Sequence, residues 1–257
     1  IAVRLSRAIT KRDHIAFCGY HGWHDWFIGT TDLNSGIPKF NDQLAHSFSY
    51  NDLSSLEKIF SKNKNKIACV IMEPITVNGP MSKPSGSTKW KDYNKKNNFL
   101  TDVKNLCKKN GALLVFDEVV TGFRYDIGGA QKMFDVIPDL SCWAKAMSNG
   151  IPLSAITGKR EYIKYLEKTF FSFTYGGDCI GLAAAKATIN KIEKKNVIDH
   201  LYKVGGRLKK GMNDLAKIYN LEDMIACAGY PCRSVMTIKK IGKYKKPLIT
   251  KSLIQQE

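Results

Sequence analysis

The sequence predicts an α/β protein with a mostly parallel sheet flanked by helices. Two observations support this prediction: short apolar runs alternate with stretches of helical periodicity, and several of these runs are apolar at every position. A run that is apolar throughout is typical of a strand buried on both faces, and strands that alternate with helices are typical of a parallel sheet. The length of 257 residues and the hydrophobic fraction of 44 % allow a large core and exclude disordered, collagen-like and disulfide-stapled proteins.

Five segments are expected to form strands, with helices between them. The strand candidates are 14–18, 67–72, 112–116, 140–144 and 153–157. The helix candidates carry apolar residues at helical spacing and are 52–61 (with Asp52 as its N-cap), 100–109, 131–134 and most of 177–215. A polar stretch without periodicity, about 81–98, is expected to be an exposed loop.

The chain is expected to contain one large domain, residues 1–215, followed by the beginning of a second one. Strand-like pieces from Met224 onward indicate that residues 216–257 start a smaller α+β domain. The first residues, IAVRLSRAIT, and the last, SLIQQE, both resemble the interior of a helix. We therefore expect the chain to be truncated at both ends.

Composition also bears on compartment and partners. No window approaches 18 consecutive apolar residues, so no membrane-spanning helix is expected, and the start lacks the features of a signal peptide. The seven cysteines form no CxxC pair, and several lie in apolar runs, which favours buried thiols in a reducing cytoplasm.

The formal net charge of +17 raises the alternative of a nucleic-acid-binding protein. Of the 40 basic residues 33 are Lys and only seven are Arg, and the Lys residues are spread over loops and helix faces. Nucleic-acid readers cluster their basic residues and use Arg for bidentate contacts. A solvated, lysine-rich surface is therefore the preferred interpretation, with steering of acidic ligands as a further consequence.

The most unusual residues follow directly after strand candidates. In a parallel sheet the carboxyl ends of the strands share one edge, where ligands bind. The segments expected at this edge are 19–26, 73–79, 117–124 and 145–150.

Asp117 and Lys145 form a suggestive pair at this edge. Asp117 follows an apolar strand, where a buried carboxylate needs a cationic partner, although it could instead only cap the next turn. Lys145 lies between apolar or small neighbours, 28 residues later, and a buried Lys can supply the neutral amine for a Schiff base. Its alternative is an ordinary surface Lys. An acid and an amine so placed suit a cofactor ring with a pyridinium nitrogen and an aldehyde.

The stretch GYHGWH, residues 19–24, offers close backbone approach at its glycines and flat faces at its aromatic rings. A metal site at His21, His24 and Asp25 lacks a further ligand at recognisable spacing, and we expect no metal.

Four stretches together resemble the class III aminotransferases, which are pyridoxal-phosphate (PLP) enzymes of the aspartate-aminotransferase fold, fold type I. They are GYHGW (19–23), DEVVTGFR (117–124), AKAMSNGIPLSAITG (144–158) and FTYGGDCIGLAAA (173–185). Within the class, the chain is most similar to glutamate-1-semialdehyde 2,1-aminomutase and its relatives. The likeness covers nearly the whole chain and is weakest at 81–98 and after Lys239.

This resemblance implies a role for each matching residue. Lys145 would form the Schiff base with PLP and move the proton between substrate and cofactor, and Asp117 would pair with the pyridine nitrogen. The other expected cofactor contacts are Val119 beneath the ring, Tyr20 stacked on its other face, His21 and Gly22 beside it, and Thr174 at the phosphate. Glu73 would support the ring or the substrate pocket. Thr174 would act across the interface of a homodimer, and the substrates would be a small amino donor and a carbonyl acceptor.

The resemblance also has departures. The family's phosphate loop would lie upstream of Ile1, and its C-terminal domain would continue past Glu257. Aminomutases usually have a Gly-rich stretch after the lysine, where this chain reads AMSNG. We therefore expect an aminotransferase, with the aminomutase as the alternative. A catalytically silent relative remains a third interpretation, and the truncated chain alone could be inactive.

Overall fold

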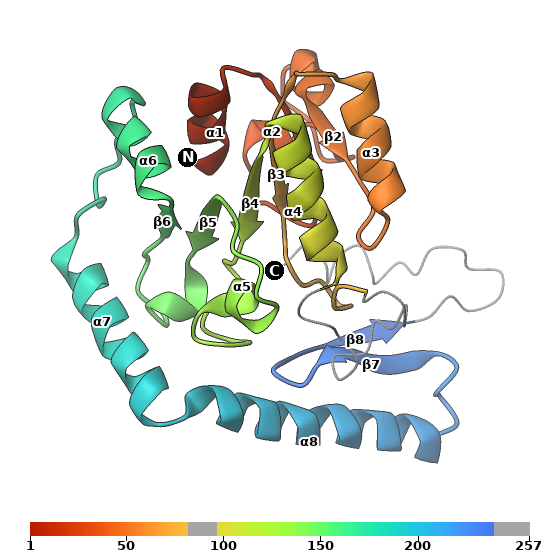
Figure 1. Cartoon of the computed structure of the whole chain (residues 1–257). Coiled ribbons are helices and arrows are strands. Elements are labelled where there is room, and N and C mark those ends of the chain that lie inside the picture. The colour runs from red at the N-terminus through yellow and green to blue at the C-terminus, as the bar shows by residue number, and fades with distance from the viewer. Residues whose placement is uncertain (82–96, 239–257) are drawn as a thin grey trace. The chain divides into compact units, whose positions relative to one another are not determined.

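The computed structural model describes residues 1–81 and 97–238, and its centre is a six-stranded sheet (Figure 1). The strand order is β2-β1-β3-β4-β5-β6, in which the first five strands are parallel and β6 runs antiparallel to β5. The strands are β1 (His14–Cys18), β2 (Ala45–Ser47), β3 (Ile67–Met72), β4 (Leu113–Asp117), β5 (Leu140–Trp143) and β6 (Ala155–Gly158). The predicted α/β fold with a mostly parallel sheet is confirmed.

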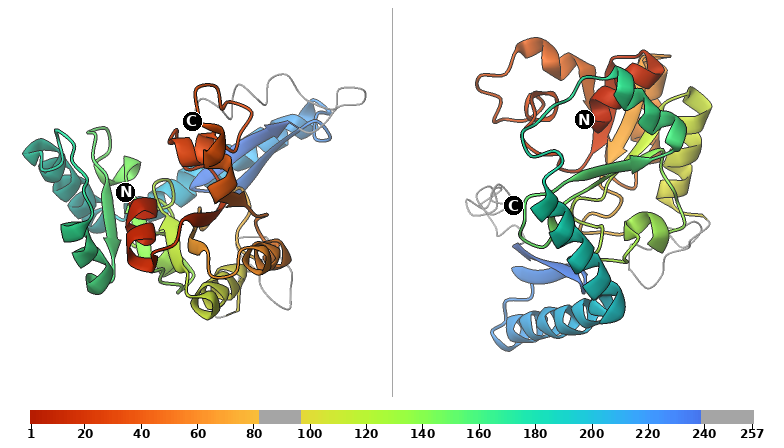
Figure 2. Two further views of the ribbon diagram at one scale, coloured as in Figure 1. Left: turned by 90° about the horizontal axis from the view of Figure 1, so that it is seen from above. Right: turned by 90° about the vertical axis from the view of Figure 1, so that its left-hand side faces the viewer.

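Helices cover both faces of this sheet. The α-helices of this part are α1 (Ala2–Thr10), α2 (Asp25–Ile28), α3 (Leu53–Lys62), α4 (Phe99–Asn110), α5 (Gly129–Met133), α6 (Arg160–Ile163) and α7 (Cys179–Lys194). Short 3-10 helices are η1 (Lys39–Leu44), η2 (Lys145–Met147) and η3 (Lys164–Lys168). The views in Figure 2 place α1 and α6 on one side of the sheet and α4 on the other.

The core follows from the alternation of side chains along each strand. Ile15, Phe17, Ile71 and Val115 point to one face, where they form a buried cluster with Leu5 of α1. The intervening residues point to the other face and are buried as well, so that all six residues of β3 are inaccessible to solvent. This two-sided burial explains why the strands read as continuous apolar runs.

Local signals place the helix ends close to their predicted positions. The carboxylate of Asp52 accepts from the backbone N–H of Ser55 and caps α3, as the sequence predicts. Asn98 caps α4 in the same way, through the N–H groups of Leu100 and Thr101. Of the predicted loop 81–98, residues 82–96 lie outside the described residues.

The chain divides into two compact units, Ile1–Lys195 and Asn196–Glu257. The second unit contains α8 (Val197–Ile218), β7 (Ile225–Tyr230) and β8 (Arg233–Ile238), and its two strands form an antiparallel hairpin. The side-chain amide of Asn213 on α8 both donates to and accepts from the backbone of Cys227 on β7. α8 therefore packs with the hairpin inside the second unit.

The same division interrupts the long helix predicted over 177–215. Asn196 adopts a left-handed conformation, with φ 48°, and separates α7 from α8. Asn tolerates this conformation better than most residues, because its short polar side chain can form hydrogen bonds with the neighbouring backbone.

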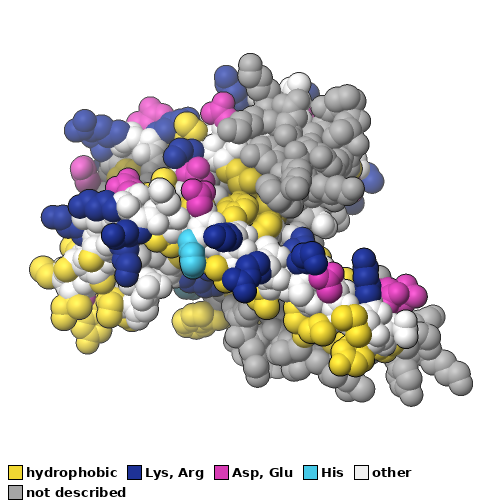
Figure 3. Space-filling model, turned by 90° about the horizontal axis from the view of Figure 1, so that it is seen from below, with side chains coloured by type: hydrophobic (Ala, Val, Ile, Leu, Met, Phe, Trp, Pro, Cys, Tyr) yellow, Lys and Arg dark blue, Asp and Glu magenta, His cyan; other side chains and the backbone are white. Residues whose placement is uncertain are grey.

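The surface of the described residues carries many basic side chains. On the face drawn in Figure 3, Lys and Arg are scattered among acidic and apolar side chains. Within residues 1–81 and 97–238, no helix combines the length and the apolar character needed to cross a bilayer.

Candidate functional site

Four strand ends bring the predicted site segments to one edge of the sheet. Strands β1, β3, β4 and β5 are consecutive neighbours and all parallel, so the residues that follow them emerge on the same side. The last ladder pair between β4 and β5 joins Asp117 to Cys142, and Lys145 follows three residues later. The topology therefore places Asp117 and Lys145 at the same edge of adjacent strands.

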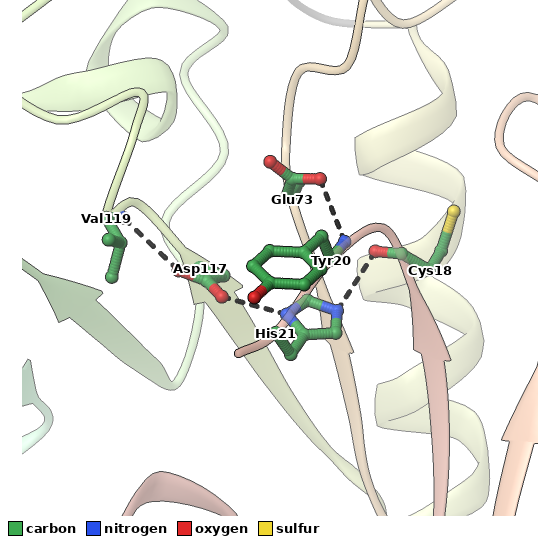
Figure 4. Close-up of polar contacts among 6 residues, drawn as sticks. All are labelled: Cys18, Tyr20, His21, Glu73, Asp117 and Val119. Atoms are coloured by element: carbon green, nitrogen blue, oxygen red, sulfur yellow. Dashed lines mark hydrogen bonds and ion pairs between the residues drawn. The ribbon is translucent and has the colours of Figure 1, made fainter. Parts of the chain in front are cut away.

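The central contact of this edge joins His21 to Asp117 (Figure 4). The Nδ1 atom of His21 lies 2.8 Å from Asp117 Oδ2, and the two side chains are 1 % and 13 % exposed. The other oxygen of Asp117, Oδ1, accepts from the backbone N–H of Val119 at 3.2 Å. Asp117 is thus both a turn-capping residue and the partner of a buried imidazole, 96 residues away in the sequence.

Neighbouring groups fix the His21 ring from several sides. Its second nitrogen, Nε2, lies 3.2 Å from the carbonyl oxygen of Cys18, so that both ring nitrogens face oxygen atoms. The ring also stacks on Trp26, with centroids 5.8 Å apart, and meets the Phe27 ring edge to face at 5.5 Å. The His21 ring is therefore held in one orientation beside Asp117.

Glu73 and Tyr20 meet on the neighbouring strand ends. The backbone N–H of Tyr20 donates to Glu73 Oε2 at 3.0 Å, and the Glu73 N–H donates to the carbonyl of Cys18. Gly19 makes this approach possible, because its φ is 105° and a Cβ there would lie 2.6 Å from Glu73 Oε2. Tyr20 is 54 % exposed, and its ring and that of Phe27 meet edge to face, with centroids 5.5 Å apart.

Lys145 differs from its prediction, because its side chain is exposed and not buried. The physical reason is its position beyond the strand: the chain leaves β5 at Trp143, and Lys145 begins the 3-10 turn η2. Its φ of 47° is uncommon for a residue other than glycine. Such conformations are frequent at functional sites, where the surrounding structure over-determines them.

The remaining predicted cofactor contacts range from exposed to half-buried. Thr174 is exposed in the loop before α7. Gly22 continues the turn after His21 with a φ of 86°, and Val119 is half-buried beside Asp117. Among the described residues, no group of three or more His, Cys, Asp or Glu side chains is arranged to hold a metal ion.

Sequence reasoning missed Glu118, which is 0 % exposed directly after Asp117. Its carboxylate accepts from the Thr121 hydroxyl and from the backbone N–H groups of Ala130 and Gln131. The available signal was a second acidic residue in an otherwise apolar stretch, DEVV, since a buried carboxylate requires dedicated donors.

A separate pocket of about 540 Å³ is lined by residues of β5, β6 and the segment 123–137. Its lining includes Phe123, Trp143, Met147 and Ala155 but neither Asp117 nor His21. The pocket is therefore not the site described above.

Comparison with known proteins identifies the family. The sequence profile of the family described as "Aminotransferase class-III" matches residues 7–239. The chain belongs to this family. The class III aminotransferases are PLP-dependent enzymes, so the recognised family, its fold type and its cofactor are confirmed.

Relatives named for two different activities show the same sequence identity to this class III aminotransferase chain. It is 36 % identical over 253 residues to a 3-aminobutyryl-CoA aminotransferase of Cloacimonas acidaminovorans, covering 96 % of this chain and 57 % of the relative. It is also 36 % identical over 235 residues to a glutamate-1-semialdehyde 2,1-aminomutase of Clostridium beijerinckii, covering 86 % of this chain and 52 % of the relative. The chain thus spans slightly more than half the length of each.

Solved structures agree on the fold of this class III chain. The FumI protein of Sphingopyxis sp. MTA144, described as a PLP internal aldimine form, aligns with a TM-score of 0.79 and 25 % identity. This alignment covers 93 % of the chain and 55 % of FumI. A glutamate-1-semialdehyde aminomutase of Pseudomonas aeruginosa aligns with a TM-score of 0.72 and 19 % identity, covering 92 % and 54 %.

Proposed function

We propose that this chain is the cofactor-binding part of an aminotransferase that transfers an amino group from a small amino donor to a carbonyl acceptor through Lys145. The observation that carries the proposal is the Asp117–His21 pair at the sheet edge, beside the strand end that leads to Lys145. Glutamate-1-semialdehyde 2,1-aminomutase is the second candidate, because relatives with either name are 36 % identical to this chain.

The residues at the edge fit the chemistry of PLP. Bound PLP supplies an aldehyde that reacts with amines and a pyridine ring that withdraws electrons when protonated. Asp117 is 13 % exposed and accepts only two hydrogen bonds, so it can accept a third from a pyridine N–H. The contact with His21 fixes the orientation of the Asp117 carboxylate for this purpose. We therefore place Asp117 at the pyridine nitrogen.

Lys145 then acts as the amine and as the base. Lys145 is exposed and follows the strand next to Asp117, so we expect it to approach a ring held by Asp117 from the side of β5. As a free amine, Lys145 would remove the proton from the substrate Cα and deliver it to C4′, the aldehyde carbon of the cofactor. Removal of Lys145 would therefore abolish both functions.

The other edge residues shape the cofactor position. The exposed Tyr20 provides a ring for stacking, Val119 an apolar contact, and Gly22 the turn beside His21. Glu73 holds the backbone of Tyr20, which supports a positioning role. We retain Thr174 as a ligand of the cofactor phosphate.

We infer a homodimer from the surroundings of Thr174. The loop and the first turn of α7 expose several large apolar side chains, including Phe170 at 83 %, Tyr175 at 77 % and Ile180 at 68 %. Apolar side chains gathered in this way mark interaction surfaces. A second copy that covers them would bring Thr174 to the partner's site, in agreement with its expected role across an interface.

We further propose that the first compact unit belongs to the cofactor domain, that the second belongs to a smaller domain, and that the protein is cytoplasmic. The seven cysteines all lie in the described residues and are free, which suits a reducing compartment. The scattered basic side chains in Figure 3 do not favour nucleic-acid binding over small acidic ligands.

The experiment adds PLP to the full-length protein and follows its visible absorbance. We expect a band that borohydride reduction removes while it fixes the cofactor to Lys145, as peptide mapping would show. Lys145→Ala should lose the band, whereas the exposed helix variant Lys186→Ala should keep it. A band that survives Lys145→Ala would reject this function. A silent relative would form the band but transfer no amino group.

A further inference from the structure

Glu118 is a fully buried acid that the proposed reaction does not use. It lies beside Asp117 but is 0 % exposed, so it cannot contact a substrate or cofactor at the sheet edge. A buried carboxylate is costly unless several donors surround it. Its contacts therefore indicate what it does for the fold of this edge.

Glu118 joins the end of β4 to a loop that returns from the site. Oε2 accepts from the Thr121 hydroxyl and from the Ala130 N–H at 3.0 Å, and Oε1 accepts from the Gln131 N–H at 2.9 Å. Three donors on three different residues thus converge on one carboxylate. The loop 121–131 is held at both of its ends by the same side chain.

The fit around this carboxylate is tight. Gly129 has a φ of 71°, and a Cβ at this position would lie 2.6 Å from the carboxyl carbon of Glu118. Only glycine combines this conformation with this close approach. The carboxylate therefore has little freedom to move once the loop is in place.

The backbone around Glu118 carries this restraint to Asp117. The Glu118 N–H donates to the carbonyl of Cys142 at 2.9 Å, which extends the β4–β5 ladder by one residue. The carbonyl of Glu118 accepts from Gly122 at 2.8 Å. Between these bonds lies Val119, whose N–H donates to Asp117 Oδ1. The orientation of the Asp117 carboxylate is therefore tied to the position of Glu118.

We propose that Glu118 is the positioning residue of this site: by clamping the loop 121–131 to the end of β4, it holds Asp117 in line with His21. This inference rests on the proposed function only where it concerns catalysis, since the clamp itself is a property of the protein without cofactor.

Electrostatics agrees with such a role. Burial raises the pKa of the Glu118 carboxyl, hydrogen bonds from Thr121 and the α5 backbone oppose the rise, and the neighbouring charge of Asp117 adds to it. The buried Glu118 carboxyl is therefore influenced by the charge of Asp117 next to it.

The test replaces Glu118 by Gln, which keeps the shape but exchanges one acceptor oxygen for a donor. Two readouts are followed: the ring N–H signal of His21 by ¹⁵N NMR in the cofactor-free protein, and the separate values of kcat and KM in the loaded enzyme. We expect the His21 Nδ1–H signal to shift and exchange faster, because its acceptor Asp117 is no longer held. We expect kcat to fall about 10- to 100-fold with KM changed less than about twofold, since a misplacement of about 1 Å costs on this order.

Thr121 provides a milder variant and a rescue. Thr121→Val removes one donor to Glu118, so we expect smaller changes in the His21 signal and in kcat. Thr121→Ser keeps the hydroxyl and should resemble the unaltered protein. Glu161→Gln on α6 exchanges an exposed acid and serves as the control. If Glu118→Gln does not fold, the His21 signal and kcat of the two Thr121 variants test the proposal instead.

The outcomes separate this inference from the proposed function. If the unaltered protein fixes no PLP on Lys145, the function fails, but the His21 signal still tests the clamp. If PLP is fixed and both the His21 signal and kcat of a folded Glu118→Gln or Thr121→Val match Glu161→Gln, the inference is overturned.

Discussion

The bond between His21 and Asp117 is the contact at the site whose loss can be measured most directly. In His21→Phe the ring remains aromatic and keeps its packing against Trp26 and Phe27, so no cavity forms. The variant removes only the 2.8 Å bond to Asp117 and the 3.2 Å contact to the Cys18 carbonyl. The effect therefore reports on the polar contacts alone.

The expected cost follows from these contacts. A hydrogen bond to a charged group contributes about 1.5–3 kcal/mol, and breaking a fully buried pair costs about 3–5 kcal/mol. Asp117 is 13 % exposed and keeps the Val119 N–H, so the full burial value does not apply. We expect a loss of about 2–3 kcal/mol in the free energy of unfolding, or a fall in Tm of about 5–10 °C for a unit of this size.

Urea denaturation of the cofactor-free protein measures this loss. His24→Phe is the matched control, because His24 lies on the same turn but is exposed and stacks only on Trp23. It should change the unfolding free energy by less than about 0.5 kcal/mol. Equal unfolding free energies of the two variants would refute the reasoning. The contacts of His21 with Asp117 and Cys18 would then contribute no more to stability than the exposed His24 does.

Three further predictions concern the same unit. Gly129→Ala should destabilise the protein by about 2–5 kcal/mol, because its φ is 71° and the new methyl group would lie 2.6 Å from a buried carboxylate. The thiol of Cys179 is exposed and should react rapidly with a thiol reagent, whereas Cys69 should react only on unfolding, because burial raises its pKa to about 12. The unfolding free energy should decrease as pH falls below 6.5, because burial lowers the pKa of both His14 and His46, and their neutral forms are favoured only in the folded state.

Each of these three has its control. Gly36→Ala introduces the same methyl group at φ 84° with no atom within 4 Å. The loss of unfolding free energy should therefore come from the backbone conformation alone, without a steric clash. Cys179→Ser should abolish the rapid phase of thiol reaction. His46→Gln should flatten the stability profile between pH 6.5 and the folded-state pKa values, and an unchanged slope would contradict the role of the pair, whose ring nitrogens lie 2.9 Å apart.

The sequence by itself determined five of the six strands of the central sheet and the order of the site segments. A strand buried on both faces must be apolar throughout, so β3 appears with its observed bounds, Ile67–Met72, in the sequence alone. Capping residues such as Asp52 are equally local, because their bonds reach only two or three residues along the chain. The parallel arrangement then sufficed to place Asp117 and Lys145 at one edge.

Only the tertiary structure decided which side chains meet there. The partner of Asp117 is 96 residues away, and no local pattern encodes such a pairing. The three-residue strand β2 has too little apolar sequence to be recognised, and the exposure of Lys145 depends on where β5 ends. Glu118 likewise became interpretable only when the loop 121–131 supplied its donors. Periodicity reports burial, whereas contacts between distant segments depend on how the strands and loops pack together.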